Sequence, residues 1–193
     1  MKKPTKKPAP KGHRVKKPQK AAGGKFKVLF GEQEIRRRVR QLATQINRAY
    51  EGKTLHVVAV QENAFVFTAD LIRALKVPVY CTFVRADIRD SSMGGTATRE
   101  ITYTPRVDAA GKDILLIEGI LQSGMTMDHL LRYLLGQNPA SVKTASLVEK
   151  TDERKVDVPT DYVGFKASGK YLVGYGLGHQ GQYINLPFIA ALP

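Results

Sequence analysis

The sequence contains one cysteine and no long hydrophobic run, and each shortage excludes a class of protein. A single cysteine cannot form an internal disulfide, and no metal-ligand spacing surrounds Cys81. We interpret Cys81 as a small, buried, apolar residue on a strand. No apolar stretch approaches the roughly 20 residues of a membrane span, and no apolar segment near the start is typical of a secretory signal. These features predict a cytoplasmic protein without membrane association.

Acidic residues are absent from the first 27 positions. That segment, MKKPTKKPAPKGHRVKKPQKAAGGKFK, carries ten lysines and Arg14 and so holds +11 of the formal net charge of +14, which leaves about +3 for the rest of the chain. Its Lys-Pro repeats lack apolar periodicity, and we predict that residues 1–24 form a disordered tail. Two roles stay open for the tail. It is either a salt-sensitive anchor on nucleic acid, ribosomes or another acidic surface, or a solubilising segment without a dedicated partner.

Residues 25–193 alternate between apolar strands and amphipathic helices, which predicts one globular domain. Helices are expected at 31–53, at 62–76, and after the loop that follows residue 121, where Gly136 ends the last helix. Strands are expected at 54–61, 77–86, 100–105, 113–121, 140–150, 162–167 and 170–177. The polar stretch 87–99 is interpreted as a mobile loop or lid. This pattern indicates an α/β fold with a mainly parallel central sheet flanked by helices.

The loop Gln122–Thr126, between a strand and a helix, has the composition of a phosphate-binding loop. Ser123, Gly124 and Thr126 offer hydroxyls and backbone donors without bulk, and a helix N-terminus adds free N–H groups and a positive dipole end. Ligands of such sheets bind beyond the carboxyl ends of strands, where both this loop and Gln61–Asn63 are predicted to lie. The alternative is an ordinary turn with Thr126 as the helix N-cap.

Several longer motifs occur in the order of a known family. They are GKTLHVVAV, AFVFTADLIRAL, PVYCTF, GKDILLIEGILQSGMT, LVEKTDERKVDVPTDYVGF, KYLVGYGL and YINLPFI. From about Val28 to Leu192 the chain resembles the hypoxanthine-guanine phosphoribosyltransferases of purine salvage. The resemblance implies the type I phosphoribosyltransferase fold. It also implies transfer of a phosphoribosyl group from phosphoribosyl pyrophosphate to a purine nitrogen, assisted by Mg²⁺.

The resemblance assigns ligand contacts to two parts of the sequence. The 5′-phosphate cradle falls on Ser123, Gly124, Met125 and Thr126. Lys150 falls on a lysine that contacts the exocyclic oxygen of the purine. Tyr171 falls on an aromatic residue that stacks on the base, and Leu172 on a residue whose backbone groups read the edge of the base. These matches imply that a purine nucleotide still fits the site.

The positions that the family uses for proton transfer and for ribose binding match this sequence less well. Family members hold the ribose hydroxyls with two adjacent acids, of which Glu118 remains and the other is Gly119. The acid that opens the family's phosphate loop lies near the purine N7 and is assigned general acid/base catalysis. Gln122 replaces it, and an amide cannot cycle a proton at neutral pH.

Pyrophosphate and metal contacts are also replaced. The pyrophosphate-binding turn becomes Gln61-Glu62-Asn63, where the Glu62 carboxylate would repel pyrophosphate. Gly178 replaces an aspartate that contacts the metal, and Ile184 replaces an arginine that meets pyrophosphate. A Ser-Tyr pair of the family's mobile loop falls on Ile88-Arg89. The sequence therefore identifies no metal ligand.

Three functions stay open on the sequence alone. The first is a nucleotide-binding protein of this family, expected to bind a purine 5′-monophosphate or phosphoribosyl pyrophosphate, with transferase activity weakened or lost. The second is an active, divergent hypoxanthine phosphoribosyltransferase that uses Mg²⁺. The third is a nucleic-acid- or ribosome-associated protein whose basic tail supplies the affinity. The resemblance also implies a homo-oligomer.

Overall fold

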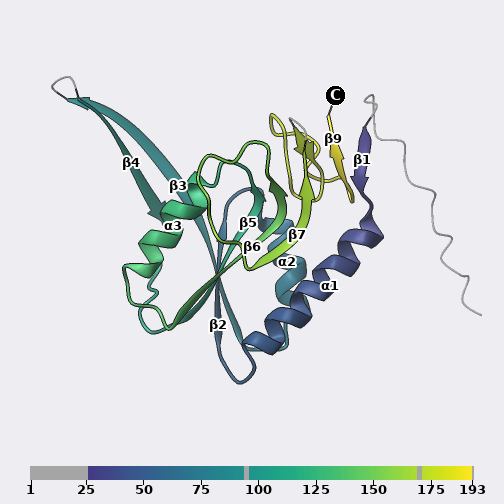
Figure 1. Ribbon diagram of the computed structural model, residues 1–193, viewed down its shortest axis with the longest axis horizontal. Coiled ribbons are helices and arrows are strands. Elements are labelled where there is room, and N and C mark those ends of the chain that lie inside the picture. Colours follow the sequence, from purple (N-terminus) through teal and green to yellow (C-terminus); the bar gives the residue numbers. More distant parts are fainter. Residues whose placement is uncertain (1–25, 94–95, 169–170, 193) are drawn as a thin grey trace, which may run out of the picture.

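The computed structural model describes residues 26–93, 96–168 and 171–192, so the predicted tail at residues 1–24 lies outside them (Figure 1). The described helices are α1 (Glu32–Ala49), α2 (Phe65–Ala74) and α3 (Met125–Leu135). The described strands are β1 (Lys27–Phe30), β2 (Leu55–Val60), β3 (Val79–Met93), β4 (Thr96–Thr104), β5 (Asp113–Leu121), β6 (Ser141–Lys150), β7 (Tyr162–Ala167), β8 (Leu172–Val173) and β9 (Ile189–Ala191).

Six strands form the central sheet, in the order β4-β3-β2-β5-β6-β7. Strands β2, β3, β5, β6 and β7 run parallel, and β4 pairs antiparallel with β3 at the edge. The strands β2 and β5 are in register from Leu55↔Asp113 to Ala59↔Ile117. Their carboxyl ends therefore meet at one edge of the sheet. The mainly parallel α/β fold predicted from the sequence is confirmed.

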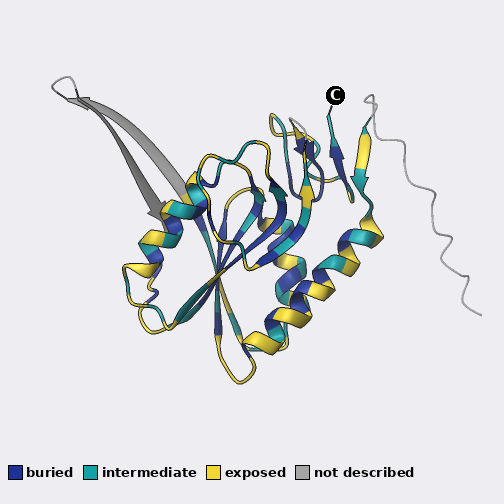
Figure 2. Cartoon of the chain, in the orientation of Figure 1, coloured by how far each residue is buried: buried dark blue, intermediate teal, exposed yellow. Residues whose placement is uncertain are grey.

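Helices cover the sheet on both faces, with α1 and α2 on one side and α3 on the other (Figure 1). Ile35, Val39, Leu42 and Ile46 recur at helical spacing on α1, and all four are buried in the core cluster under α1 and α2. A second cluster lies under α3 and includes Met127, Leu130 and Leu134. Figure 2 shows the buried residues on the strands and on the sheet-facing sides of the helices. No helix in the described part of the chain is long and apolar enough to span a membrane.

A small second sheet, in the order β1-β9-β8, joins the two ends of the described chain. Within it, β9 pairs antiparallel with both neighbours. The sequence predicted one continuous strand at 170–177, but only Leu172–Val173 is strand. Gly174 and Gly176 have φ values of 94° and 91°, so the chain turns there instead of extending.

Two further expectations were wrong. The stretch 87–99, predicted as a loop, belongs mostly to β3 and β4, which pair in register from Arg85↔Thr104 to Met93↔Thr96. Cys81 lies on a strand as predicted but is exposed, not buried. The described part of β4 pairs with β3 only from Arg85 onward, so Cys81 lies where β3 forms the edge of the sheet. Ile88 and Arg89 lie in β3.

Candidate functional site

A hollow of about 390 Å³ lies at the carboxyl edge of the central sheet, where β2 and β5 end side by side. Its walls come from the turn after β2 and the end of β5, with one residue each from β3 and α3. The lining residues are Val60, Gln61, Glu62, Asn63, Arg85, Glu118, Gly119, Ile120 and Thr126. The fold thus brings together two stretches that lie far apart in the sequence and carry the polar groups singled out above.

Glu118 supplies a buried carboxyl group to this hollow. Within the described residues, its Oε2 atom is buried and has no hydrogen-bond partner. Burial raises the pKa of Glu118 to about 7, although the positive charge of Arg154 opposes the rise. Near neutral pH the group is therefore divided between its neutral and ionised forms. Either form can hydrogen-bond to a ligand hydroxyl, as acceptor or as donor.

The backbone of Asn63 occupies the space beside Gly119. A Cβ atom added to Gly119 would lie 2.1 Å from the Asn63 carbonyl oxygen and 3.0 Å from Ala64 N. Backbone atoms cannot withdraw as the tip of a flexible side chain does, so position 119 has no room for a carboxylate. The turn after β2 therefore passes so close to position 119 that it leaves space for glycine but not for the second acid.

The loop before α3 is held by backbone contacts from the segment after β6. The carbonyl oxygen of Ser123 accepts hydrogen bonds from Lys155 N and Val156 N, each at 3.0 Å. Gly124 has a φ of 83°, and a Cβ there would lie 2.4 Å from the Val156 carbonyl oxygen. Only glycine fits both the backbone conformation and the space.

Helix α3 begins at Met125, with Gly124 as its N-cap and no side-chain cap. The alternative that Thr126 caps the helix is therefore wrong, because Thr126 already lies in the first turn, facing the hollow. Ser123 Oγ accepts a hydrogen bond from Met125 N at 3.4 Å. The remaining free N–H groups of this first turn give the loop the donors that an anion requires.

Gln122 and Lys150 are joined through Glu153, a residue that the sequence interpretation missed. The Glu153 carboxylate accepts hydrogen bonds from Gln122 Nε2 and from Lys150 Nζ. The Lys150 side chain is 0% exposed and that of Glu153 is 36% exposed. The carboxylate therefore lies between the buried ammonium group and solvent.

The Glu149 carboxylate, at the end of β6, is the centre of further charged contacts near Glu153. Arg154 Nη2 donates a hydrogen bond to Glu149 Oε1, and Lys166 Nζ lies 3.8 Å from the other oxygen of Glu149. Arg154 Nη1 is buried without a partner among the described residues, and its charge acts on Glu118. The only signal in the sequence was the alternating charge of 149-EKTDERK-155 directly after a strand.

Tyr171 and Leu172 lie away from the lining of the hollow at Glu118. Tyr171 is 49% exposed, and its ring centroid lies 4.2 Å from that of His179. Leu172 is buried in β8 opposite Ala191. Their assignment to purine binding stays a prediction.

The positions of the expected metal and pyrophosphate contacts are filled by an apolar contact. A Cβ added to Gly178 would lie 2.8 Å from Cγ1 of Ile184, so the two replaced positions pack against each other. Within the described residues, no group of three or more His, Cys, Asp or Glu side chains is placed to hold a metal ion. The contact between Gly178 and Ile184 therefore supplies no oxygen ligand for Mg²⁺.

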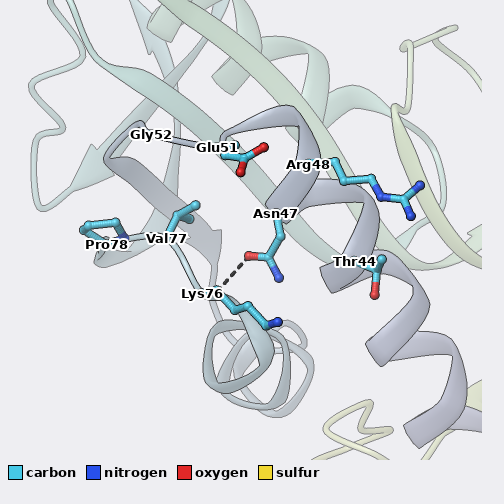
Figure 3. Close-up of a pocket in the computed structure, with 8 residues that line it drawn as sticks. All are labelled: Thr44, Asn47, Arg48, Glu51, Gly52, Lys76, Val77 and Pro78. Carbon is cyan, nitrogen blue, oxygen red and sulfur yellow. Dashed lines mark hydrogen bonds between the residues drawn. The ribbon is translucent and has the colours of Figure 1, made fainter.

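Another hollow, of about 440 Å³, lies at the opposite edge of the sheet, before β2 and β3 (Figure 3). Its central polar side chain, Asn47, accepts a hydrogen bond from Lys76 N at 2.7 Å and donates one to the Ala74 carbonyl oxygen at 3.4 Å. These bonds connect α1 to the end of α2 and to the segment that follows it, so they serve the fold. The carboxyl-edge hollow is the better candidate for function.

The chain is similar to known proteins along most of its length. A model of the phosphoribosyl transferase domain matches residues 29–180. The chain is 39% identical over 168 residues to a hypoxanthine-guanine phosphoribosyltransferase of Aquifex aeolicus, covering 86% of this chain and 93% of that one. A solved hypoxanthine-guanine phosphoribosyltransferase from Bacillus anthracis is 35% identical with a TM-score of 0.75, covering 86% of this chain and 98% of that one. A hypoxanthine phosphoribosyltransferase from Trypanosoma cruzi, in complex with the product IMP, is 31% identical with a TM-score of 0.78, covering 91% and 98%.

The crowding at Gly119 gives a first prediction. Gly119→Asp should lower the free energy of unfolding by about 3 kcal/mol or more, because the new Cβ overlaps the backbone of Asn63. The matched control is Gly31→Asp, at the N-cap of α1, where nothing lies within 4 Å and an aspartate caps the helix. Urea denaturation of the two variants tests the difference. Equal stabilities would contradict the crowding argument.

The pKa of Glu118 gives a second prediction. Because its folded-state pKa is raised from 4.5 to about 7, ionising this group costs stability as the pH rises through that interval. The full cost is on the order of 3 kcal/mol. Between pH 5 and pH 8 the wild type should therefore lose stability relative to Glu118→Gln, which keeps the shape without the charge. Urea denaturation across this pH range measures the difference, and parallel curves would show that Glu118 ionises freely.

Proposed function

The chain belongs to the hypoxanthine-guanine phosphoribosyltransferase family, and on that basis we propose that it binds a purine 5′-monophosphate or phosphoribosyl pyrophosphate with weakened or lost transferase activity. One observation carries the proposal. The resemblance assigns Gln122 to the position of the family's proton-transferring acid, and the amide of Gln122 is hydrogen-bonded to Glu153. An amide cannot take up and release a proton at neutral pH, and losing such a group typically costs about 10²- to 10⁴-fold in rate.

Binding of a 5′-phosphate is supported by the loop before α3. Gly124 lets the backbone turn with its N–H groups free, and the contacts of Ser123 with Val156 hold that conformation before any ligand arrives. A preorganised loop loses little conformational entropy on binding. The complex of a related enzyme from Trypanosoma cruzi with IMP supports a monophosphate as the ligand class.

The charges around the hollow support weak binding of pyrophosphate. Its lining includes two acids, Glu62 and Glu118, and one arginine, Arg85. Gly178 and Ile184 add an apolar contact where the resemblance places a metal ligand and a cation. We therefore propose no Mg²⁺ site on the protein, and we expect Mg²⁺ to matter only as the partner of phosphoribosyl pyrophosphate in any remaining transferase activity.

Calorimetry and turnover measurements test this function. We expect inosine or guanosine 5′-monophosphate to bind with the same Kd with and without Mg²⁺, and phosphoribosyl pyrophosphate to bind more weakly. Conversion of hypoxanthine or guanine should be at least about 10²-fold slower than for the Bacillus subtilis relative, which is 33% identical. Turnover equal to that of the relative would reject the proposal and favour the active, divergent transferase.

Two variants separate binding from proton transfer. Gly124→Ala should abolish monophosphate binding, because its Cβ would lie 2.4 Å from the Val156 carbonyl oxygen. Gln122→Asp should leave binding intact and raise any residual turnover by returning a proton-accepting group. If Gln122→Asp has no effect on a measurable turnover, the missing acid is not what limits the reaction.

A second candidate function, binding of nucleic acid through the basic tail, is favoured by the exposed face of α1. Arg36, Arg37 and Arg40 line a surface hollow of about 580 Å³ together with glutamine and threonine side chains. Arg36 pairs with Glu32 at 2.7 Å, whereas Arg37 and Arg40 have no ion-pair partner among the described residues. Together with the +11 charge of residues 1–27, this face suits a phosphate backbone.

Deletion of residues 1–24 tests this candidate. Affinity for single-stranded RNA should fall roughly tenfold or more and lose much of its salt dependence, because fewer counterions are released. Monophosphate binding should not change. Arg37→Gln/Arg40→Gln should give a smaller loss in the full chain, and Gln45→Ala, at an exposed position of the same helix, serves as the control. If the deletion leaves RNA binding unaltered, the tail has no such role. The cytoplasmic location and the homo-oligomer both stay predictions.

A further inference from the structure

We propose that Arg154 is a positioning residue for Glu118: its buried charge allows the Glu118 carboxyl to ionise near neutral pH and so sets the pH range in which the carboxyl-edge hollow binds a nucleotide. The inference rests on the proposed function, since it takes the ligand from there. It goes beyond that function because it gives a role to a residue outside the lining of the hollow and makes binding depend on pH.

The Arg154 side chain is held in a defined place beside the phosphate loop. Its Nη2 atom donates a hydrogen bond to Glu149 Oε1 at the end of β6. Its Cδ atom lies 3.4 Å from the position that a Cβ on Gly124 would occupy. The side chain is only 16% exposed, so most of its length is packed against protein. The guanidinium group is therefore fixed between the end of β6 and the loop before α3.

The alternation of side chains along β5 places Glu118 on the same side of the sheet as this loop. Ile114 and Leu116 belong to the cluster under α3, and Glu118, two residues further along the strand, continues that side. Its register partner on β6 is Ser146, a buried residue without charge. The fold thus brings the carboxyl group to the side of the sheet that carries the loop against which Arg154 packs.

Each of these two charged groups has a buried atom that is unpaired within the described residues. Glu118 Oε2 and Arg154 Nη1 are both shielded from solvent, and neither has a hydrogen-bond partner there. Buried charged atoms are normally paired, because an unpaired one loses the hydration that it had in water. Since no hydrogen bond joins the carboxyl to the guanidinium, the two groups affect each other through charge.

The positive charge of Arg154 opposes the effect of burial on Glu118. Burial raises the pKa of the carboxyl group to about 7, and the guanidinium charge holds that pKa below the value that burial alone would give. The other groups around the carboxyl come from the turn after β2, from β3, from α3 and from β6, and they are the charged Glu62 and Arg85 and the uncharged Thr126 and Ser146. Of the charged groups in the described part of the chain, Arg154 is the one that lowers the pKa of Glu118 toward neutrality.

Ionised Glu118 should bind a ligand hydroxyl more strongly than neutral Glu118 does. A hydrogen bond to a carboxylate is charge-assisted and roughly twice as strong as one between neutral groups. Because the folded-state pKa is about 7, the ionised form gains population as the pH rises through that value. Nucleotide affinity should therefore rise over the same interval. Without the charge of Arg154 the pKa of Glu118 would be higher, so the rise in affinity would move to higher pH.

Titrations of the full chain across neutral pH test the inference with two measurements. Carbon-13 NMR of labelled glutamate carboxyl groups follows Glu118 without ligand, and the Glu118→Gln variant identifies its signal. Calorimetry with inosine 5′-monophosphate follows the affinity, and Glu118→Gln reports the titration of the ligand's own phosphate. Arg154→Met should raise the midpoints of both titrations by about one pH unit or more, because the opposing charge is gone. Arg154→Lys keeps the charge and should restore midpoints close to those of the wild type.

A variant of opposite sign keeps the test decisive if Arg154→Met does not fold. Glu149→Gln removes the acid that is paired with Arg154, so both midpoints should fall. The matched control is Lys166→Gln, which removes an exposed charge 3.8 Å from the same Glu149 and should leave both midpoints unchanged.

Three results overturn the inference while the proposed function stands. They are an NMR midpoint of Glu118 that stays the same in Arg154→Met and Glu149→Gln, an equal shift in Lys166→Gln, and a nucleotide affinity that does not follow the titration of Glu118. Absence of inosine 5′-monophosphate binding by the wild type at every pH overturns the proposed function. The NMR midpoints, which need no ligand, then still decide whether Arg154 sets the ionisation of Glu118.

Discussion

The contact between the backbone after β6 and the loop after β5 is the constraint on which the site depends. Ser123 O is held by Lys155 N and Val156 N, and Gly124 lies so close to Val156 that no side chain fits between them. This contact does two things at once. It fixes the N–H groups of the phosphate loop, and it places the segment that carries Glu153 beside Gln122. The phosphate loop and the hydrogen bond between Gln122 and Glu153 are therefore positioned by the same few backbone atoms.

The positions that depart from the family are coupled to their neighbours through packing. Gly119 lacks a carboxylate where Asn63 brings its backbone, and Gly178 lacks one where Ile184 brings its side chain. The two positions differ in how easily an acidic side chain could be put back. Backbone atoms fill the space beside Gly119, whereas the two atoms nearest to a Cβ at Gly178 belong to the side chain of Ile184. Restoring an acid should therefore be far easier at Gly178, with Ile184 shortened, than at Gly119.

Burial decides the electrostatics of the site. A fully buried lysine is rarely left without a partner, and Glu153 supplies one for Lys150. Glu118 has an arginine near enough to affect it but no hydrogen bond to Oε2, so its proton is held more tightly. Hydrogen bonds from Lys150 and Gln122 lower the pKa of Glu153, whereas desolvation raises the pKa of Glu118 to about 7. Perturbed pKa values of carboxyl groups are frequent at ligand sites.

The sequence by itself determined the α/β fold and the strand-loop-helix unit at 113–135, because apolar periodicity and the glycine of the loop act locally. The resemblance of several longer motifs, in order along the chain, indicated the family. It also identified Gln122 and Gly119 as departures. Only the tertiary structure decided what fills those positions, since Asn63 and Glu153 reach them from distant parts of the chain. Cys81 was misjudged for the same reason: its exposure depends on where β3 becomes the edge of the sheet, which pairing between strands decides and no local pattern records.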